Sequence, residues 1–254
     1  MEGVIPYGPS AGKTYEVVLV SWNRTGGIRS LLRSIEDQDL PAPHVHLINN
    51  NIEKVEELEG IIDDMARPQT ISVSHNMENM GCMARFLRAR ESSADFSVFL
   101  DDDQVLTSRG ALSGMLATAR RHTLSAWWSW DYQTRYVART RVSGGNIAKH
   151  CGPGGMVADN SLFRDQLFWD RWEPRYYPVD DVWVSCFAKA KGWDLRGYAD
   201  FGVAFQEEYS GDSNAMFKSA GMTELKQELA DKVRNSRGLW PLPAKPLVQA
   251  PGRH

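Results

Sequence analysis

Four apolar segments alternate with amphipathic segments between residues 15 and 122, and this alternation constrains the fold more than any other feature. The apolar segments are 15–20, 44–48, 70–73 and 96–100. Between them, apolar residues recur every three or four positions, as Ile28, Leu31 and Ile35 do, which predicts helices. Strands joined by helical crossovers of this length run parallel, so the sequence predicts a mostly parallel sheet.

Each predicted strand ends in polar residues. These residues are Ser21, Asn23 and Arg24 after the first strand, Asn49 to Asn51 after the second, His75 and Asn76 after the third, and Asp101 to Asp103 after the fourth. Open sheets of parallel strands bind their ligands in the crevice outside the carboxyl ends. We therefore expect one binding site in which the four polar clusters meet.

The three consecutive carboxylates of Asp101, Asp102 and Asp103 follow the fourth strand directly. Like charges at this spacing raise the cost of ionising their neighbours, and a divalent cation removes that cost. Carboxylate oxygens suit Mg²⁺ or Mn²⁺. A solvated acidic turn explains an isolated triplet equally well, but the other polar strand ends favour a metal site.

Composition excludes several classes of protein. The 254 residues have a net charge of −3, which gives no general attraction to nucleic acid or to anionic membranes. We find no signal peptide at the N-terminus and no apolar stretch of the roughly 20 residues that cross a bilayer. The three cysteines are far apart and form no zinc motif. We expect a cytoplasmic protein without a membrane span.

Five motifs occur in an order that resembles the GT-A glycosyltransferases, most closely the family-2-like inverting group. They are the segment 18–24, Asn49-Asn50-Asn51, Asn79-x-Gly81, the segment 99–103 and Asp180-Asp181. The resemblance covers roughly residues 15–205. It implies a Rossmann-like α/β fold, with a mostly parallel central sheet flanked by helices and an irregular second half on the acceptor side.

The resemblance also implies which residues hold a nucleotide sugar and a metal ion. The implied nucleotide-sugar residues are Ser21, Asn23, Arg24, Asn49, Asn79, Gly81, Arg85, Asp101, Asp102, Gly154 and Gly155. Asp101-x-Asp103 resembles the DxD motif, so Asp103 and Asp101 would bind Mn²⁺ or Mg²⁺, with Mn²⁺ favoured. Asn49 stands where relatives carry an Asp that contacts the base, which leaves UDP-, GDP- and dTDP-sugars open as donors.

Asp180-Asp181 resembles the ED motif, whose Asp deprotonates the acceptor hydroxyl. Alignment with that motif favours Asp181 as the general base, followed by Asp180. The alternative is a pair of carboxylates that satisfies free N–H groups at the start of a helix. Relatives often carry a later histidine that ligates the metal, and none lies between His150 and His254.

Two further features of the second half are compared with the relatives. Gln206, Glu207 or Glu208 is a candidate for the position of the missing histidine; the alternative is a metal held by Asp103, the diphosphate and water. The Ser-, Gly- and Asn-rich loop 209–222 resembles a lid. We also expect a last amphipathic helix over 224–235.

The acceptor side has weaker signals. The segment 125–130 reads as one strand, in which alternation would place Trp128 and Trp130 on one face and Trp127 on the other. Trp128, Trp169 and Asp170 are the candidate acceptor residues. Four basic residues also lie in this half: Arg135, Arg139, Arg141 and Lys149. They could hold an anionic acceptor, or they could form a solvated strand face.

The sequence thus predicts a single domain in four segments. Residues 1–14 form a loose lead-in, 15–122 the nucleotide-sugar-binding half, 123–238 the acceptor and catalytic half, and 239–254 a Pro-rich tail. The predicted enzyme moves a sugar from a nucleotide-sugar donor to an acceptor hydroxyl. A sugar or small molecule is favoured as the acceptor over a protein or nucleic acid.

Two other functions stay open. A nucleotidyltransferase that makes nucleotide sugars typically carries a glycine-rich basic loop after the first strand, and residues 21–27 lack its basic run. A nucleotide-sugar-binding module without catalysis is the second alternative, and the intact triplet and Asp pair argue against it.

Overall fold

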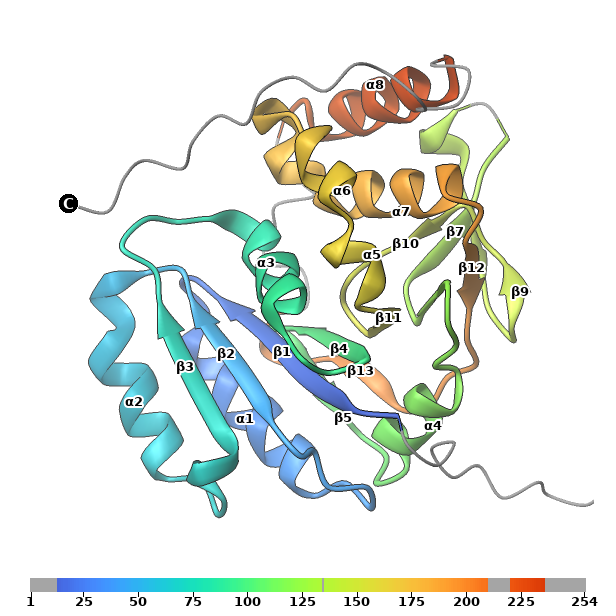
Figure 1. Ribbon diagram of the computed structural model, residues 1–254. Coiled ribbons are helices and arrows are strands. Elements are labelled where there is room, and N and C mark those ends of the chain that lie inside the picture. The colour runs from blue at the N-terminus through green and yellow to red at the C-terminus, as the bar shows by residue number, and fades with distance from the viewer. Residues whose placement is uncertain (1–12, 134, 210–219, 236–254) are drawn as a thin grey trace, which may run out of the picture.

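The computed structural model describes residues 13–133, 135–209 and 220–235 (Figure 1). The strands of the central sheet are β1 (Tyr15–Ser21), β2 (Val45–Asn49), β3 (Ile71–His75), β4 (Phe96–Asp101), β6 (Thr123–Ala126), β9 (Asn146–Ile147), β11 (Met156–Asp159) and β12 (Asp194–Gly197). The two smaller sheets contain β7 (Ser129–Asp131), β8 (Thr140–Val142) and β10 (His150–Cys151), and β5 (Gln104–Leu106) and β13 (Val203–Phe205). The helices are α1 (Thr25–Glu36), α2 (Val55–Asp63), α3 (Ala84–Glu91), α4 (Ala111–Ala117), α5 (Ser161–Arg164), α6 (Gln166–Asp170), α7 (Asp180–Ala190) and α8 (Met222–Asn235).

The central sheet has the strand order β3-β2-β1-β4-β11-β6-β12-β9. Its first four strands are parallel, because α1, α2 and α3 return the chain to the same end of the sheet each time. β11 runs antiparallel to both β4 and β6, while β12 is parallel to β6. The prediction of a mostly parallel sheet flanked by helices is confirmed.

Both faces of the sheet are covered, which explains why β1 is apolar at nearly every position. Side chains alternate along a strand, so Val17 and Leu19 pack toward α1, α2 and α4. Val18 and Val20 pack toward α3, α5 and α7 on the opposite face. Figure 1 shows these two helical layers on either side of the strands.

The segment 125–130 is not a single strand, and that expectation is wrong. The chain leaves β6 at Trp127, whose backbone N–H donates to Gly155 O at 2.9 Å. Gly152 N–H donates to Trp128 O at 2.7 Å, so the two tryptophans connect the central sheet to the sheet of β7. The rings of Trp127 and Trp128 are neighbours, with centroids 5.2 Å apart, instead of facing opposite sides.

Some expectations fall on parts of the chain outside the described residues. Of the lead-in 1–14, only residues 13 and 14 are described, and the tail 239–254 lies outside them altogether. The loop 209–222 is described only at its two ends. The last helix is present as α8, close to its predicted bounds.

Two helical glycines give a matched test of the packing around residues Asp101 to Asp103, here called the acidic loop. A Cβ at Gly27 in α1 would lie 2.3 Å from Asp102 O, whereas nothing lies within 4 Å of one at Gly60 in α2. We expect Gly27→Ala to lower the free energy of unfolding by about 1–3 kcal/mol. Gly60→Ala should raise it by up to about 1 kcal/mol, because Ala favours the helix. Urea unfolding measures both, and equal effects would contradict the contact.

Candidate active site

The carboxyl ends of β1 to β4 lie together at one edge of the central sheet. In the strand register Ser21 pairs with Asn49, and Asn49 pairs with His75. On the other side of β1, Val20 pairs with Asp101. The polar residues that follow the four strands therefore meet at this edge, as the sequence predicts.

Two arginines form ion pairs with the three carboxylates of the acidic loop. Arg85 Nη1 lies 2.7 Å from Asp101 Oδ1, and only 3% of the Arg85 side chain is exposed. Arg24 binds the other two, with Nη2 2.6 Å from Asp102 Oδ1 and Nη1 2.7 Å from Asp103 Oδ2. Asp103 Oδ1 is buried and has no hydrogen-bond partner among the described residues.

The acidic loop favours a further positive charge. Burial raises the pKa of Asp102 to about 7, and Asp103 and Asp101 add to this effect while Arg24 opposes it. Burial and the charge of Asp101 also raise the pKa of Asp103. Since each carboxylate makes its neighbours harder to ionise, a cation at the loop would favour the charged forms.

The loop fits a divalent metal that is held jointly with phosphate groups. Within the described parts of the chain, no cluster of three or more His, Cys, Asp and Glu side chains is arranged to hold a metal. Mg²⁺ sites of enzymes that use nucleotides often need only one or two carboxylates, with substrate phosphates and water. The buried, unpartnered Oδ1 of Asp103 and the nearby Asp101 supply such hard oxygen ligands.

Glycines let the backbone approach the first carboxylate closely. A Cβ at Gly154 would lie 2.3 Å from Asp101 Oδ2, so a side chain there would displace this carboxylate. Gly155 has a φ of +75°, a conformation that favours glycine. Its N–H donates to Phe99 O at 2.9 Å, which fixes this turn against β4.

The asparagines at the ends of the first two strands divide into buried and exposed residues. Asn49 is fully buried; its Nδ2 lies 3.0 Å from His75 Nδ1, and its Oδ1 accepts the N–H of Asn51 at 2.9 Å. Both ends of its amide are therefore in use inside the protein. Asn51 Nδ2 donates to Asn23 Oδ1 at 2.9 Å, and this pair is exposed.

Ser21 and the Asn79–Gly81 turn complete the nucleotide side. Ser21 is buried, and its hydroxyl has no hydrogen-bond partner in the described structure. Asn79 Oδ1 accepts the N–H of Gly81 at 2.8 Å, which shapes the turn before α3. Gly81 has a φ of +59°, and a Cβ there would lie 2.8 Å from the ring of Tyr177.

Asp180 and Asp181 begin α7 but have opposite environments. Asp181 Oδ2 lies 2.6 Å from Lys226 Nζ in α8 and 3.2 Å from His150 Nε2. Although burial opposes it, these two groups lower the pKa of Asp181 well below its usual value. Asp180 is 4% exposed, and its Oδ2 has no hydrogen-bond partner among the described residues. Burial and the charge of Asp181 raise the pKa of Asp180 to about 7.

Arg85 connects the acidic loop with the start of α7. Burial works against its charge, yet Asp101, Cys82 and Asp180 together raise the pKa of Arg85 above its usual value. The same guanidinium thus lies in the fields of Asp101 and Asp180. The ring of Tyr177 packs on Gly81 in the turn before α3, and burial and the charge of Asp180 raise the pKa of its hydroxyl. The residues before α7 thus contact the turn before α3, and Arg85 at the start of α3 is ion-paired with the acidic loop.

Sequence reasoning missed Lys226 and Tyr177. Lys226 comes from α8, 45 residues after Asp181, and no local pattern links the two. Tyr177 directly precedes the helix that begins at Asp180, and its place before an Asp pair is the one signal that could have suggested it.

Replacing Lys226 with Ala tests the partner of Asp181. The two side chains are 15% and 14% exposed, and breaking such a pair leaves a poorly solvated carboxylate. We expect a loss of roughly 3 kcal/mol in the free energy of unfolding at pH 7. A lowered carboxyl pKa stabilises the fold above the unfolded value of 3.8, so the loss should shrink as the pH falls below about 4. Urea unfolding at pH 7 and pH 3 measures this, and a loss that is equal at both would contradict the ion pair.

The remaining predicted residues have other surroundings. Gln206 is buried beside the acidic loop, where its Nε2 donates to Gly27 O at 3.0 Å and to Gln104 O at 2.8 Å, so its amide supports the backbone. Glu207 is exposed, and the side chain of Glu208 lies outside the described residues. Trp169 donates its indole N–H to Phe163 O at 2.7 Å, and Asp170 accepts from Gln166 at 2.8 Å. These last contacts are structural.

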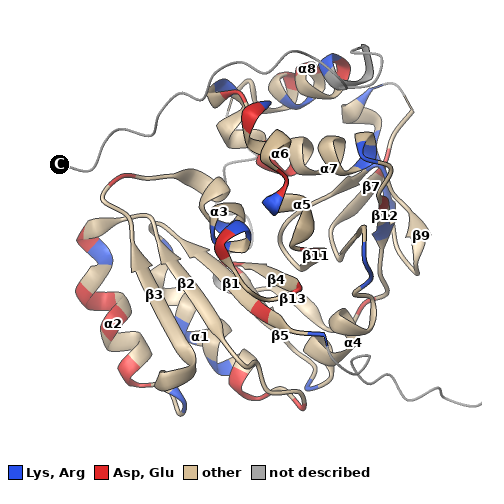
Figure 2. Cartoon of the chain, in the orientation of Figure 1, with Lys and Arg blue, Asp and Glu red and all other residues tan. Residues whose placement is uncertain are grey.

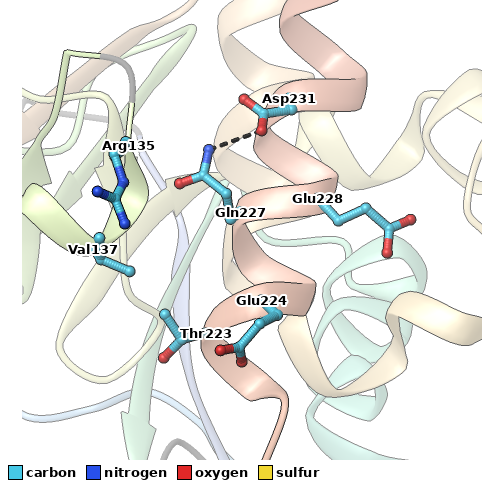
Figure 3. A pocket seen from close by; sticks show the side chains of 7 residues that line it. All are labelled: Arg135, Val137, Thr223, Glu224, Gln227, Glu228 and Asp231. Atoms are coloured by element: carbon cyan, nitrogen blue, oxygen red, sulfur yellow. Dashed lines mark hydrogen bonds between the residues drawn. The ribbon is translucent and has the colours of Figure 1, made fainter.

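A surface depression of about 350 Å³ lies between α8 and residues 135–137, and none of its lining residues belongs to β1–β4 or to the acidic loop (Figure 3). Its lining residues are Arg135, Val137, Thr223, Glu224, Gln227, Glu228 and Asp231. Of the residues that the sequence singles out, only Arg135 lines it. We therefore place the candidate site at the sheet edge. No helix of the described ranges has the length and apolar character needed to cross a bilayer.

Comparisons with known proteins agree with this architecture. Neither a protein-family model nor a curated protein matches the chain. Among solved structures, the mannosyltransferase PcManGT from Pyrobaculum calidifontis, in complex with GDP-Man and Mn²⁺, matches with a TM-score of 0.57 and 12% identity, over 87% of this chain and 71% of that chain. TarS 1-349 of S. aureus, in complex with UDP-GlcNAc, matches with a TM-score of 0.58 and 14% identity, over 87% and 67%.

GalNAc-T7 with UDP, GalNAc and Mn²⁺ matches with a TM-score of 0.54 and 13% identity, over 87% of this chain and 50% of that chain. At such low identity these matches establish the fold alone. The chain therefore has the GT-A fold of these glycosyltransferases, as its motifs predict.

Proposed function

We propose that this chain is a metal-dependent glycosyltransferase that moves a sugar from a nucleotide-sugar donor to an acceptor hydroxyl. The observation that carries the proposal is the ion pair of Arg85 with Asp101 of the acidic loop, together with the contact of Tyr177, which precedes α7, with Gly81 in the turn before α3. A loop for the donor diphosphate and a buried carboxylate for the acceptor would then share one cleft. The fold and the nucleotide-sugar complexes of the similar structures support this assignment.

The donor side would use the polar ends of the first three strands. Asn23 and Asn51 form an exposed amide pair that can reach a base or ribose with donors and acceptors. Asn49 is engaged inside the protein, so we propose that it shapes this turn. Arg85, Arg24 and the closely packed Gly154 would position the diphosphate next to the acidic loop.

Asp103 and Asp101 would hold the divalent metal, Mn²⁺ or Mg²⁺, together with phosphate oxygens of the donor. When bound, such an ion supplies positive charge that stabilises the diphosphate as it leaves. Arg24 and Arg85 add fixed positive charge at the same place. The Mn²⁺ complexes of two similar structures support the choice of a divalent metal.

We propose Asp180 as the general base, ahead of Asp181. A base needs a free oxygen and a pKa near the working pH. Asp180 has an unpartnered buried oxygen and a pKa raised to about 7. The ion pair with Lys226 keeps Asp181 ionised, but it also occupies the Asp181 carboxylate. We therefore propose that Asp181 anchors α7.

The reaction would proceed by direct displacement with inversion. The acceptor oxygen attacks the anomeric carbon of the donor and gives its proton to Asp180, while the bond from that carbon to the diphosphate oxygen breaks. One bond forms and one breaks at the anomeric carbon, and the nucleoside diphosphate leaves as the anion. NMR of the product linkage tests the inversion.

Incubation with Mn²⁺ and a panel of UDP-, GDP- and dTDP-sugars tests the proposed function. Slow, metal-dependent release of nucleoside diphosphate is expected, because water can replace the acceptor. Exchange of pyrophosphate would instead indicate a nucleotidyltransferase. Tight binding of a donor without any turnover would indicate a binding module, and no binding of any donor would refute the proposal.

A further inference from the structure

A surface cluster of four aromatic rings and one arginine, here called the Trp–Arg patch, consists of Trp127, Trp128, Trp130, Phe205 and Arg141. The ring of Trp128 lies 5.2 Å from that of Trp130 and 5.7 Å from that of Phe205, measured between centroids. Trp127 lies 5.3 Å from Phe205. Phe205 is 46% exposed and the tryptophans are partly exposed, so water reaches the cluster. Apolar side chains gathered at a surface in this way often mark a binding site.

The patch borders the acidic loop on two sides. Phe205 pairs with Gln104, which follows Asp103, and the next residue, Gln206, donates its N–H to Asp103 O at 2.8 Å. On the other side, Trp127 bonds to Gly155, whose neighbour Gly154 packs against Asp101. The patch is thus attached to the same loop that would hold the donor diphosphate.

Arg141 is placed to bind an anion. Its guanidinium lies 4.0 Å from the centre of the Trp128 ring and also over Trp127 and Trp130. Stacking uses the flat face of a guanidinium and leaves its N–H edge free for other partners. One edge nitrogen donates to Trp127 O, and no carboxylate of the described residues lies within ion-pair distance of Arg141.

Burial lowers the pKa of Arg141 while Tyr198 and Asp200 oppose this effect, and a second arginine, Arg139, lies at the same patch. Arg139 stacks over Trp130 at 5.0 Å, and its Nε is buried without a hydrogen-bond partner in the described structure. Figure 2 shows Lys and Arg gathered near β7 and β12, while α2 is dominated by Asp and Glu. Of the predicted basic group, Lys149 is ion-paired with Asp131 and Arg135 lies at the depression of Figure 3.

We propose that the Trp–Arg patch is the acceptor subsite and that the acceptor is a carbohydrate bearing an anionic group. The planes of Trp128 and Phe205 stand 83° apart, so the apolar face of a sugar ring would stack on the exposed ring of Phe205 while its edge contacts Trp128. The N–H edge of Arg141 would bind the carboxylate, phosphate or sulfate of that sugar. The ring then lies beside the acidic loop, where a hydroxyl can meet the donor. This inference rests on the proposed function and names its acceptor class.

Saturation-transfer NMR titrations with three sugars test the proposal. Methyl β-glucuronide and methyl β-glucoside differ only in one carboxylate, and glucose 6-phosphate carries a phosphate instead. We expect both charged sugars to bind roughly tenfold more tightly than the neutral one, since hydrogen bonds to charged groups are the stronger ones. The relative affinity of the two charged sugars identifies which anion the patch prefers.

Variants assign the preference to the patch. Arg141→Gln should remove the advantage of the charged sugars, Arg141→Lys should keep part of it, and Trp128→Ala should weaken all three. Arg33→Gln, an exposed arginine near the far end of α1, serves as the matched control and should change nothing. Thermal melting shows that each variant is folded.

The outcomes separate this inference from the proposed function. Release of nucleoside diphosphate with Mn²⁺ is measured on the same wild-type preparation. If release occurs but the charged sugars have no advantage, or if Arg141→Gln keeps that advantage, the anionic acceptor is refuted and the proposed function stands. If no donor is bound or hydrolysed while the charged sugars still bind at the patch, the patch is a carbohydrate site and the transferase proposal fails.

Discussion

Replacing Asp180 with Asn is expected to lower the rate of sugar transfer by a factor of about 10² to 10⁴, the usual contribution of a positioned base. Donor affinity should stay the same, because in the proposed mechanism Asp180 contacts the acceptor hydroxyl and not the diphosphate. The Asn side chain keeps the size of the carboxylate but cannot accept a proton. Since burial already disfavours the charged form of Asp180, the variant should fold at least as stably as the wild type at pH 7. Single-turnover transfer and calorimetric donor titration measure the two effects.

The pH dependence gives the same prediction a second readout. Asp180 has its pKa raised to about 7, so the ionised base accumulates only as the pH rises through neutrality. The transfer rate should therefore increase between pH 6 and pH 8 in the wild type. The residual rate of Asp180→Asn should lack this rise, whereas a variant that merely disturbs the acceptor would keep it.

Asp181→Asn is the matched control. It removes the charge that Lys226 and His150 surround, so we expect lower stability but a much smaller loss of transfer. If Asp181→Asn abolishes transfer in a folded protein while Asp180→Asn remains active, the roles of the two residues are reversed. The ED-motif alignment would then be the better guide to the base.

The first half of the fold could be predicted because its pattern is local. β1, α1 and β2 follow from apolar residues at strand or helix spacing, and the carboxyl ends of parallel strands must meet at one edge. The acidic loop at the tip of β4 was therefore placed correctly from sequence. Its pairing with two arginines was not, because Arg24 lies just before α1 and Arg85 lies in α3, and no local pattern links either of them to the loop.

The second half depends on long-range pairing, which a sequence pattern does not reveal. β11 lies between β4 and β6 although it follows both along the chain, and this insertion breaks the segment 125–130 at Trp127. Asp180 and Asp181 are adjacent in sequence and look equivalent there. The approach of Lys226 from α8 and of His150 from β10 distinguishes them, since both groups lie at Asp181 while Asp180 Oδ2 is buried without a hydrogen-bond partner among the described residues.

Replacing Asp103 with Ala is expected to weaken metal-dependent donor binding by roughly a hundredfold or more, since it removes a proposed metal ligand and not just a group that supports one. Calorimetric titration of UDP-, GDP- and dTDP-sugars with and without Mn²⁺ measures this loss. The variant should not unfold, because burial and Asp101 already disfavour the charged form of Asp103. Arg24 also keeps its second partner, Asp102.

Asp102→Asn is the control for Asp103→Ala. Asp102 is 5% exposed, and burial raises its pKa to about 7. The neutral amide of Asn therefore resembles the protonated carboxyl group that Asp102 often carries at neutral pH. We expect Asp102→Asn to bind donor within a few-fold of the wild type and to keep the dependence on Mn²⁺. If both variants lose binding equally, the loop acts through its total charge and not through a ligand at position 103. If Asp103→Ala binds donor normally with Mn²⁺, the metal is held elsewhere and the proposed donor site is wrong.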